Sequence, residues 1–314
     1  MTVLTLVTSN PDAAAAAPQS FFQNRIFALA LMAAGAALIV FGIILLFIPA
    51  KKGRSRKYTG EIAVFSRSVI GDRKYQQDYC LFPKNIMAEQ VRKIGMLAAV
   101  CDGMGGMEGG ERASRCCAET VYSGYYQIGA TDNICALLKD LILEADKEVS
   151  NFTDESGRRL NSGTTVVAAV YLNSKIYWAS VGDSRIYHWH NGELHQITRD
   201  HNLRLRLLKD LENGLISREQ FDAAKQKEAL ISYVGKGREL IVDTGELDFP
   251  AGSDDVLILC SDGVYKTASE KTLCKILKET TEFEKIPAAV TDAAMAGGQS
   301  GKHDNISLIA IKRN

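Results

Sequence analysis

The hydrophobic residues of this chain form one long N-terminal run followed by many short ones. Residues 26–48 contain no charged or polar side chain. As a helix rising about 1.5 Å per residue, this run spans about 35 Å, against roughly 30 Å for a membrane's hydrocarbon core. We therefore predict a transmembrane helix over residues 26–50. A cleaved signal peptide is the alternative, but its apolar region is usually only about 7–15 residues long.

The residues that flank this helix predict its orientation. Residues 1–25 are small and polar and are expected to be a disordered tail with one basic residue, Arg25. Residues 51–60 form a basic linker that carries five lysines and arginines. This excess of positive charge places the C-terminal side in the cytoplasm and favours contact with anionic membrane lipid. We expect a single-pass protein of the inner (cytoplasmic) membrane.

Residues 61–314 are expected to form one soluble domain of mixed α and β structure. Short apolar runs predict strands, and apolar positions at helical spacing predict helices. The predicted strands are 61–68, 79–82, 96–101, 164–172, 174–181, 185–190, 193–198, 256–260 and 306–311. The predicted helices are 111–127, 132–149, 270–278 and 286–296, with two short helices in 202–227 broken at Asn213-Gly214. Because strands and helices do not alternate strictly, the fold class is α+β.

Composition removes several classes of function. Lys plus Arg equals Asp plus Glu at 37 each, so no net charge favours nucleic acid as a partner. The seven cysteines show no paired CxxC spacing and indicate neither a disulfide framework nor zinc ligation. The imidazoles of His188, His190 and His195 flank a predicted hairpin and are expected at the surface. We expect local structural roles for His201 and His303.

Carboxylates recur at the ends of predicted strands. Asp102, Asp183 and Asp262 each follow an apolar run, Asp304 precedes the final strand, and Asp78 lies where a polar loop enters a strand. If these ends converge, the carboxylates cannot all remain ionised without cations between them. Oxygen ligands of this kind suit Mg²⁺ or Mn²⁺. Taken singly, each aspartate also fits an ordinary turn.

The motifs around these aspartates occur in a recognisable order. They are Arg73-Lys74-Tyr75-Gln76-Gln77-Asp78, Asp102-Gly103-Met104-Gly105-Gly106, Gly163-Thr164-Thr165, Gly182-Asp183-Ser184-Arg185, Thr198-Arg199-Asp200-His201, Ser261-Asp262-Gly263 and Asp304-Asn305. Together they resemble the bacterial form of the metal-dependent protein serine/threonine phosphatases of type 2C (PPM). The resemblance covers residues 61–312. It implies a four-layer αββα sandwich, two antiparallel sheets flanked by helices, with a flap at 202–237 beside the site.

The resemblance also implies a role for each site residue. Asp102 bridges two Mn²⁺ or Mg²⁺ ions, and the Gly103 carbonyl binds one of them. Asp262 and Asp304 complete the shell of the first ion, and Asp78 holds metal-bound water.

Two further residues, and two departures from the family pattern, follow from the same comparison of motifs. Asp183 matches a position associated with a third, weaker ion. Arg73 matches the residue that binds the substrate phosphate. Gln77 stands where many relatives have glutamate, so the second ion is expected to be held less tightly or only through water. Met104 stands where animal relatives carry a histidine proposed as general acid.

The implied activity is hydrolysis of phosphoserine and phosphothreonine by metal-activated water, with Arg73, Asp78 and Asp102 as catalytic residues. Phosphorylated proteins are the expected substrates, and a cognate Ser/Thr kinase is an expected partner that no residue identifies. A non-catalytic sensor or scaffold at the membrane is the alternative. A nucleotide-binding loop at 103–110 is a third hypothesis, but no Lys-Ser/Thr follows the glycines.

Overall fold

The computed structural model describes residues 62–85, 87–105 and 108–313 of the chain. The predicted tail, transmembrane helix and basic linker all lie outside these residues. Within them, no helix is both long enough and apolar enough to cross a membrane.

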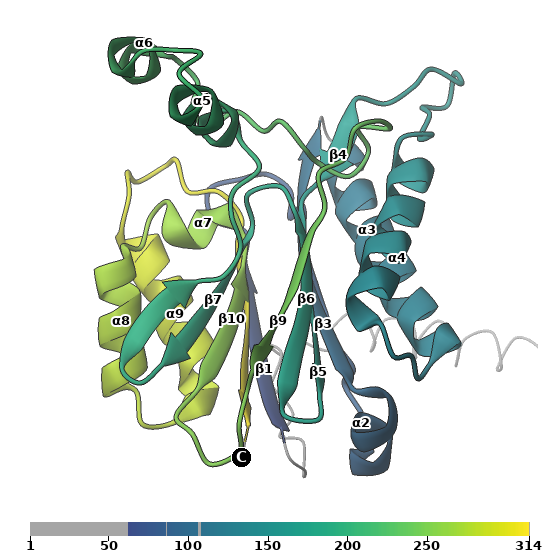
Figure 1. The fold of residues 1–314 in the computed structure, drawn as a ribbon, viewed down its shortest axis with the longest axis vertical. Helices are drawn as coiled ribbons and strands as arrows, with labels where there is room; N and C mark the ends of the chain where they lie inside the picture. Colours follow the sequence, from purple (N-terminus) through teal and green to yellow (C-terminus); the bar gives the residue numbers. More distant parts are fainter. Residues whose placement is uncertain (1–61, 86, 106–107, 314) are drawn as a thin grey trace, which may run out of the picture. The chain divides into compact units, whose positions relative to one another are not determined.

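Two antiparallel sheets form the centre of the domain (Figure 1). The first sheet contains, in spatial order, β1 (Ile62–Val69), β11 (Ile306–Arg313), β10 (Val256–Cys260), β7 (Arg185–His190) and β8 (Glu193–Gln196). The second contains β2 (Asp78–Leu81), β3 (Met96–Gly105), β5 (Val166–Leu172), β6 (Lys175–Val181) and β9 (Asp243–Asp248), and β4 (Ser162–Thr164) pairs with the end of β3.

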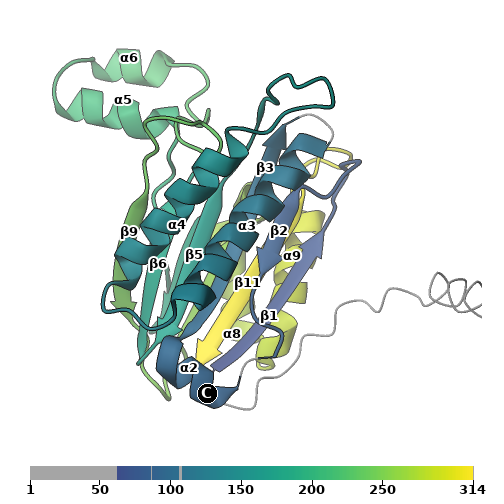
Figure 2. The same cartoon turned by 90° about the vertical axis from the view of Figure 1, so that its right-hand side faces the viewer.

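Helices cover the outer face of each sheet. Figure 2 shows α3 (Glu108–Ile128) and α4 (Ile134–Val149) in front of the second sheet. The helices α7 (Asp262–Tyr265), α8 (Glu270–Glu279) and α9 (Ile286–Ala296), with the short η1 (Phe283–Lys285), cover the first sheet. Three apolar clusters separate the four layers, one between the sheets and one beneath each set of helices. The α+β prediction and its layered sandwich are thereby confirmed.

Strand β3 shows why the central runs are continuously apolar. Leu97, Ala99 and Cys101 face the helices, whereas the alternating residues Ala98 and Val100 face the other sheet. A strand with both faces buried needs apolar residues at every position, unlike a strand with one solvated face. Burial on both sides fixes the register of the strand, and so fixes where its end lies.

Most predicted elements agree with the structure to within a few residues. The turn at Asn173-Ser174 has both residues at positive φ, 52° and 65°, as a tight hairpin requires. Helix α4 begins at Ile134, two residues after the start of its predicted range, and the Asn133 side chain caps it by accepting from the Ala136 N–H. The elements α2 (Ala88–Ile94), β9 and α7 were not predicted. Strand β9 is partly solvated along its length, and α7 has only four residues, so neither leaves a strong hydrophobic pattern.

Candidate metal centre

The second sheet brings Asp78 and Asp102 together. Asp78 opens β2 and pairs directly across from Asp102 on β3. Two like charges directly opposite each other on neighbouring strands repel. Asp78 is buried, and its Oδ2 accepts a hydrogen bond of 2.7 Å from the Ser261 hydroxyl. Since Ser261 precedes α7 on the other sheet, this bond ties the ends of the two sheets together.

The first sheet contributes Asp262, and the connection between the sheets contributes Asp183. Asp262 begins α7 directly after β10, and Asp183 lies between β6 and β7. The Lys266 ammonium contacts the Asp262 carboxylate and lies 3.7 Å from Asp183 Oδ2. The Tyr265 hydroxyl donates to the Asp183 carbonyl at 3.0 Å. Lys266, directly after α7, therefore places its ammonium group between two of the predicted metal ligands.

Arg73 and Asp304 complete the group. The Arg73 guanidinium lies 2.6 Å from Asp304 Oδ2, and both side chains are exposed enough for a ligand to reach them. The loop before β2 is positioned by Asn305, whose Oδ1 accepts from the Gln77 N–H at 2.7 Å and whose Nδ2 donates to two loop carbonyls. Gly71 in this loop has φ of +65°, and a Cβ there would lie 2.1 Å from the Asp304 carbonyl oxygen. Only glycine allows so close an approach.

Burial, followed by the charges of neighbouring carboxylates, raises the pKa values of three of these aspartates. Loss of hydration, followed by the charges of Asp78 and Asp262, holds the pKa of Asp102 well above its ordinary value. Burial raises the pKa of Asp78 to about 7, with Asp262 and Asp304 adding to the effect. Burial also raises the pKa of Asp183 to about 6. These groups therefore need protons or cations to be stable together.

Two carboxylate oxygens fit a cation directly. Asp78 Oδ1 and Asp262 Oδ1 are buried and have no hydrogen-bond partner among the described residues. An unpartnered buried oxygen is costly unless an ion or water satisfies it. The donor set consists of carboxylate and carbonyl oxygens, which suits Mg²⁺ or Mn²⁺. The residues present therefore fit a divalent-cation centre.

The glycines of β3 allow the backbone near Asp102 to pack closely. A Cβ on Gly103 would lie 2.1 Å from the Gly110 carbonyl oxygen and 2.7 Å from that of Gln77. The Gly103 N–H donates to the same Gln77 carbonyl at 3.1 Å. The Gln77 side chain donates to the Gly105 carbonyl at 3.2 Å, a bond that a glutamate could not make.

Sequence reasoning grouped aspartates that the structure brings together, but it missed residues that support them. Lys266 lies four residues after Asp262, a spacing at which opposite charges pair on a helix. The spacing predicts this ion pair only if the short helix α7 is predicted first. The Thr165 hydroxyl accepts from the Asp102 N–H at 3.1 Å and contacts the Ser184 hydroxyl at 2.6 Å. Hydroxyl contacts between distant segments leave no periodic pattern in the sequence, so they could not be predicted from it.

The two histidines next to the motifs have local structural roles, as expected. His303 Nδ1 lies 2.7 Å from Asp72 Oδ2, and its Nε2 lies 2.7 Å from the Gly297 carbonyl. His201 is fully buried and accepts from the Gly182 N–H through Nδ1, so its Nε2–H donates to Asp243.

The segment predicted as a flap is a helical hairpin joined to the end of the second sheet. It contains α5 (Leu203–Glu212) and α6 (Arg218–Ala223), broken at Asn213-Gly214 as predicted. Its return strand bonds Val234 to Thr164, whose hydroxyl donates to the Asp102 carbonyl at 2.9 Å. Figure 1 shows α5 and α6 at the same end of the domain as α7 and β4.

Comparisons with known proteins find relatives by sequence and the same fold among solved structures. Residues 63–206 match the family model described as Protein phosphatase 2C. The serine/threonine phosphatase stp of Listeria innocua is 32% identical over 222 residues, which cover 69% of this chain and 84% of that protein. The solved S. agalactiae serine/threonine phosphatase has a TM-score of 0.66 at 23% identity, covering 81% of this chain and 100% of that one. The catalytic domain of the phosphatase PstP, solved with two manganese ions, has a TM-score of 0.63 at 23% identity, covering 80% and 98%.

The raised carboxylate pKa values predict how stability depends on pH without metal. Because the folded chain binds protons at Asp78 more tightly than the unfolded chain does, this stabilisation is fully present below about pH 4 and is lost as pH rises through about 7. In EDTA, the unfolding temperature at pH 8 should therefore be below that at pH 5.5. Asp102→Asn, which removes one charge of the cluster, should flatten this slope, whereas the exposed-site variant Asp140→Asn should not. Equal slopes in all three proteins would contradict the repulsion we describe.

Proposed function

Because the chain belongs to the protein phosphatase 2C family, we propose that it is a metal-dependent protein serine/threonine phosphatase that hydrolyses phosphoserine and phosphothreonine residues of proteins. The observation that carries this proposal is the convergence of carboxylates from both sheets around two unpartnered buried oxygens, Asp78 Oδ1 and Asp262 Oδ1. A purely structural cluster would pair such oxygens within the protein. Their availability at the same end as Arg73 favours a catalyst over a sensor or scaffold.

The proposed cofactor is a pair of Mn²⁺ or Mg²⁺ ions. Asp102 pairs across from Asp78, and after loss of hydration the charges of Asp78, Asp262, Asp183 and Asp304 raise its pKa, as expected for a group near all four. Asp102 would be shared by the two ions, Asp262 and Asp304 would complete the shell of the first, and the Gly103 carbonyl would bind one of the two. Asp183, whose carboxylate lies near Lys266, would serve a third, weaker ion. When bound, the ions supply Lewis-acid charge that lowers the pKa of water and offsets charge on the phosphoryl oxygens.

The chain's own residues orient the reactants. Arg73 presents an exposed guanidinium at the edge of the centre, where its donors can bind two phosphate oxygens at once. Asp78 is held through Oδ2 by Ser261, which leaves Oδ1 to orient the attacking water. The short loops around Asn305 and Gly71 keep Arg73 close to Asp304. These contacts would hold Arg73 in place for the phosphate and Asp78 in place for the water.

The proposed location is the cytoplasmic face of a membrane. Support comes from the uncharged run 26–48 and the basic run 51–57, which together are typical of a single span with its C-terminal domain in the cytoplasm. The basic linker would keep the phosphatase domain near anionic lipid, and so near substrates at the membrane.

Removing a central ligand should abolish activity. We expect Asp102→Asn and Asp262→Asn each to lower kcat/KM toward a phosphothreonine peptide by at least about 100-fold, since each leaves an ion short of a charged ligand. Arg73→Lys should instead act mainly through KM, because lysine keeps the charge but loses the two-pronged geometry. The measurement is phosphate release by the full chain in detergent with Mn²⁺. The exposed carboxylate of Asp140 on α4 provides the matched control, and Asp140→Asn should keep normal rates. Normal rates in Asp102→Asn would rule out the shared-ligand assignment.

The membrane assignment has its own test. The full chain should stay in the membrane fraction after alkaline carbonate washing, because a spanning helix is not held by charge. Alkaline phosphatase fused after Asn314 should be inactive and a fluorescent protein at the same place should be bright, as both fusions would lie in the cytoplasm. Release by carbonate, or an active alkaline phosphatase fusion, would contradict the proposed topology.

A further inference from the structure

Two histidines and an aspartate meet at the end of the first sheet away from the carboxylate centre. Strand β7 begins at Arg185, which pairs with Cys260 two residues before Asp262, and it ends at His190. At about 3.3 Å per residue, His190 lies roughly 16 Å along the strand from Arg185. Nothing in the phosphatase reaction requires side chains at this end.

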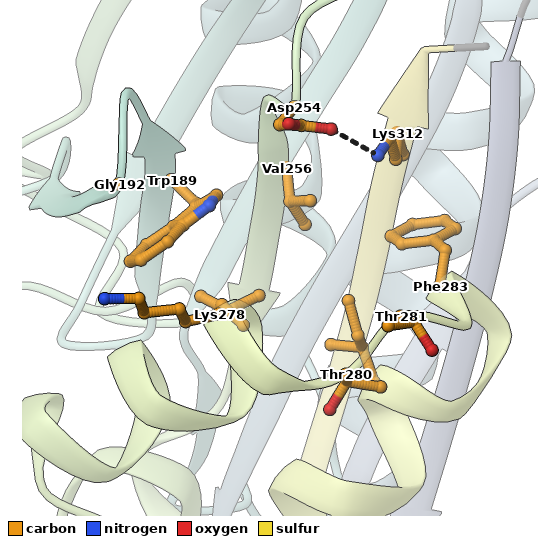
Figure 3. Close-up of a pocket in the computed structure, with 11 residues that line it drawn as sticks. Trp189, Gly192, Asp254, Val256, Lys278, Thr280, Thr281, Phe283 and Lys312 are labelled. Carbon is orange, nitrogen blue, oxygen red and sulfur yellow. Dashed lines mark hydrogen bonds and ion pairs between the residues drawn. The ribbon is translucent and has the colours of Figure 1, made fainter.

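Strand alternation places the three side chains on one face. Trp189 and Val256 are cross-strand partners that line a pocket of about 330 Å³ on the outer face, near Lys278 and Phe283 (Figure 3). The neighbours of these two residues therefore point to the inner face. His188 and His190 precede and follow Trp189, and Asp255 precedes Val256, so all three side chains lie on the inner face at adjacent positions.

The distances between their polar atoms are short. His188 Nε2 lies 3.1 Å from Asp255 Oδ2, and His190 Nδ1 lies 2.9 Å from Asp255 Oδ1. One ligand atom from each residue can be chosen so that all three lie within 4.8 Å of one another. The side chains of Asp255 and His188 are only 3% and 11% exposed, whereas His190 is 43% exposed. The prediction that these histidines lie at the surface is therefore wrong for His188.

We propose that His188, His190 and Asp255 bind a zinc ion, with water in the fourth position on the exposed side of His190. Imidazole nitrogens with one carboxylate suit Zn²⁺ far better than Mg²⁺ or Mn²⁺. Two ligands about 2.1 Å from a tetrahedral zinc lie about 3.4 Å apart, close to the contacts described above. The two contacts use different oxygens of Asp255, so the three ligand atoms, now within 4.8 Å of one another, would have to move closer together around one ion. The ion would replace the imidazole protons that now point at Asp255.

A neighbouring side chain can support the metal-bound form. The Asn191 side-chain amide lies 2.8 Å from His190 Nε2. When Nδ1 binds zinc, Nε2 carries the proton. The Asn191 amide, once rotated, would accept a hydrogen bond from this Nε2–H through its oxygen. The site would join strand β7 of the β7–β8 hairpin to Asp255, the residue just before β10. Its role would be to stabilise this end of the sheet, independently of the catalytic ions.

The test counts zinc on the full chain in detergent. Metal-free protein is titrated with Zn²⁺ in millimolar Mg²⁺, then desalted, and bound zinc and unfolding temperature are measured. His190→Asn should hold one zinc fewer per chain than the wild type, and zinc should raise its unfolding temperature less. This variant should keep normal Mn²⁺-dependent phosphatase rates, so failure of the zinc site can be told apart from failure of the proposed function.

The matched control is His195→Asn. His195 pairs across from His188 but lies outside the three-residue group and is 51% exposed. The His195→Asn variant should bind as much zinc as the wild type does. Equal zinc in His190→Asn and wild type would overturn the proposal, as would loss of the zinc in His195→Asn. The proposal would also be overturned if His190→Asn lowered the unfolding temperature equally with and without zinc. The three residues would then form only a hydrogen-bond network.

Discussion

Mutual repulsion among carboxylates governs the active end of this domain. Asp78 and Asp102 face each other across two strands, and Asp262 and Asp183 approach from the other side near Lys266. Without cations, ionising these groups together is costly, and burial, with the charges of Asp262 and Asp304 adding to it, raises the pKa of Asp78 to about 7. Bound cations would neutralise these carboxylates, so relief of the repulsion would contribute to the free energy of metal binding. The arrangement that disfavours the metal-free fold is the one that suits a divalent-cation centre.

The rest of the fold serves to hold these charges in place. Both central sheets are covered on both faces, so their strands cannot slide without moving apolar side chains to the wrong face. Contacts between the sheets, such as Ser261 with Asp78, then set the relative position of the strand ends. Asn305 and the close approach at Gly71 extend this order into the loop that carries Arg73. Rigid positioning of loops by buried strands is how such folds hold functional groups.

The sequence predicted the strands and the aspartates at their ends because both follow from short-range patterns. Continuous apolar runs mark buried strands, and an aspartate directly after such a run needs no three-dimensional information to be noticed. What it could not predict were contacts between distant segments. Lys266 became part of the centre only through the four-residue helix α7, and the solvated strand β9 has no apolar run. His188 was assigned to the surface because alternation alone does not say which face of a short hairpin is buried.

The central claim is that Asp102 is shared by the divalent ions. Calorimetric titration of the metal-free full chain with Mn²⁺ at pH 7.5 tests it most directly, since it counts ions without relying on turnover. The account predicts at least two Mn²⁺ per wild-type chain and a loss of high-affinity binding for more than one of them in Asp102→Asn. Unchanged stoichiometry and affinity in Asp102→Asn would contradict it.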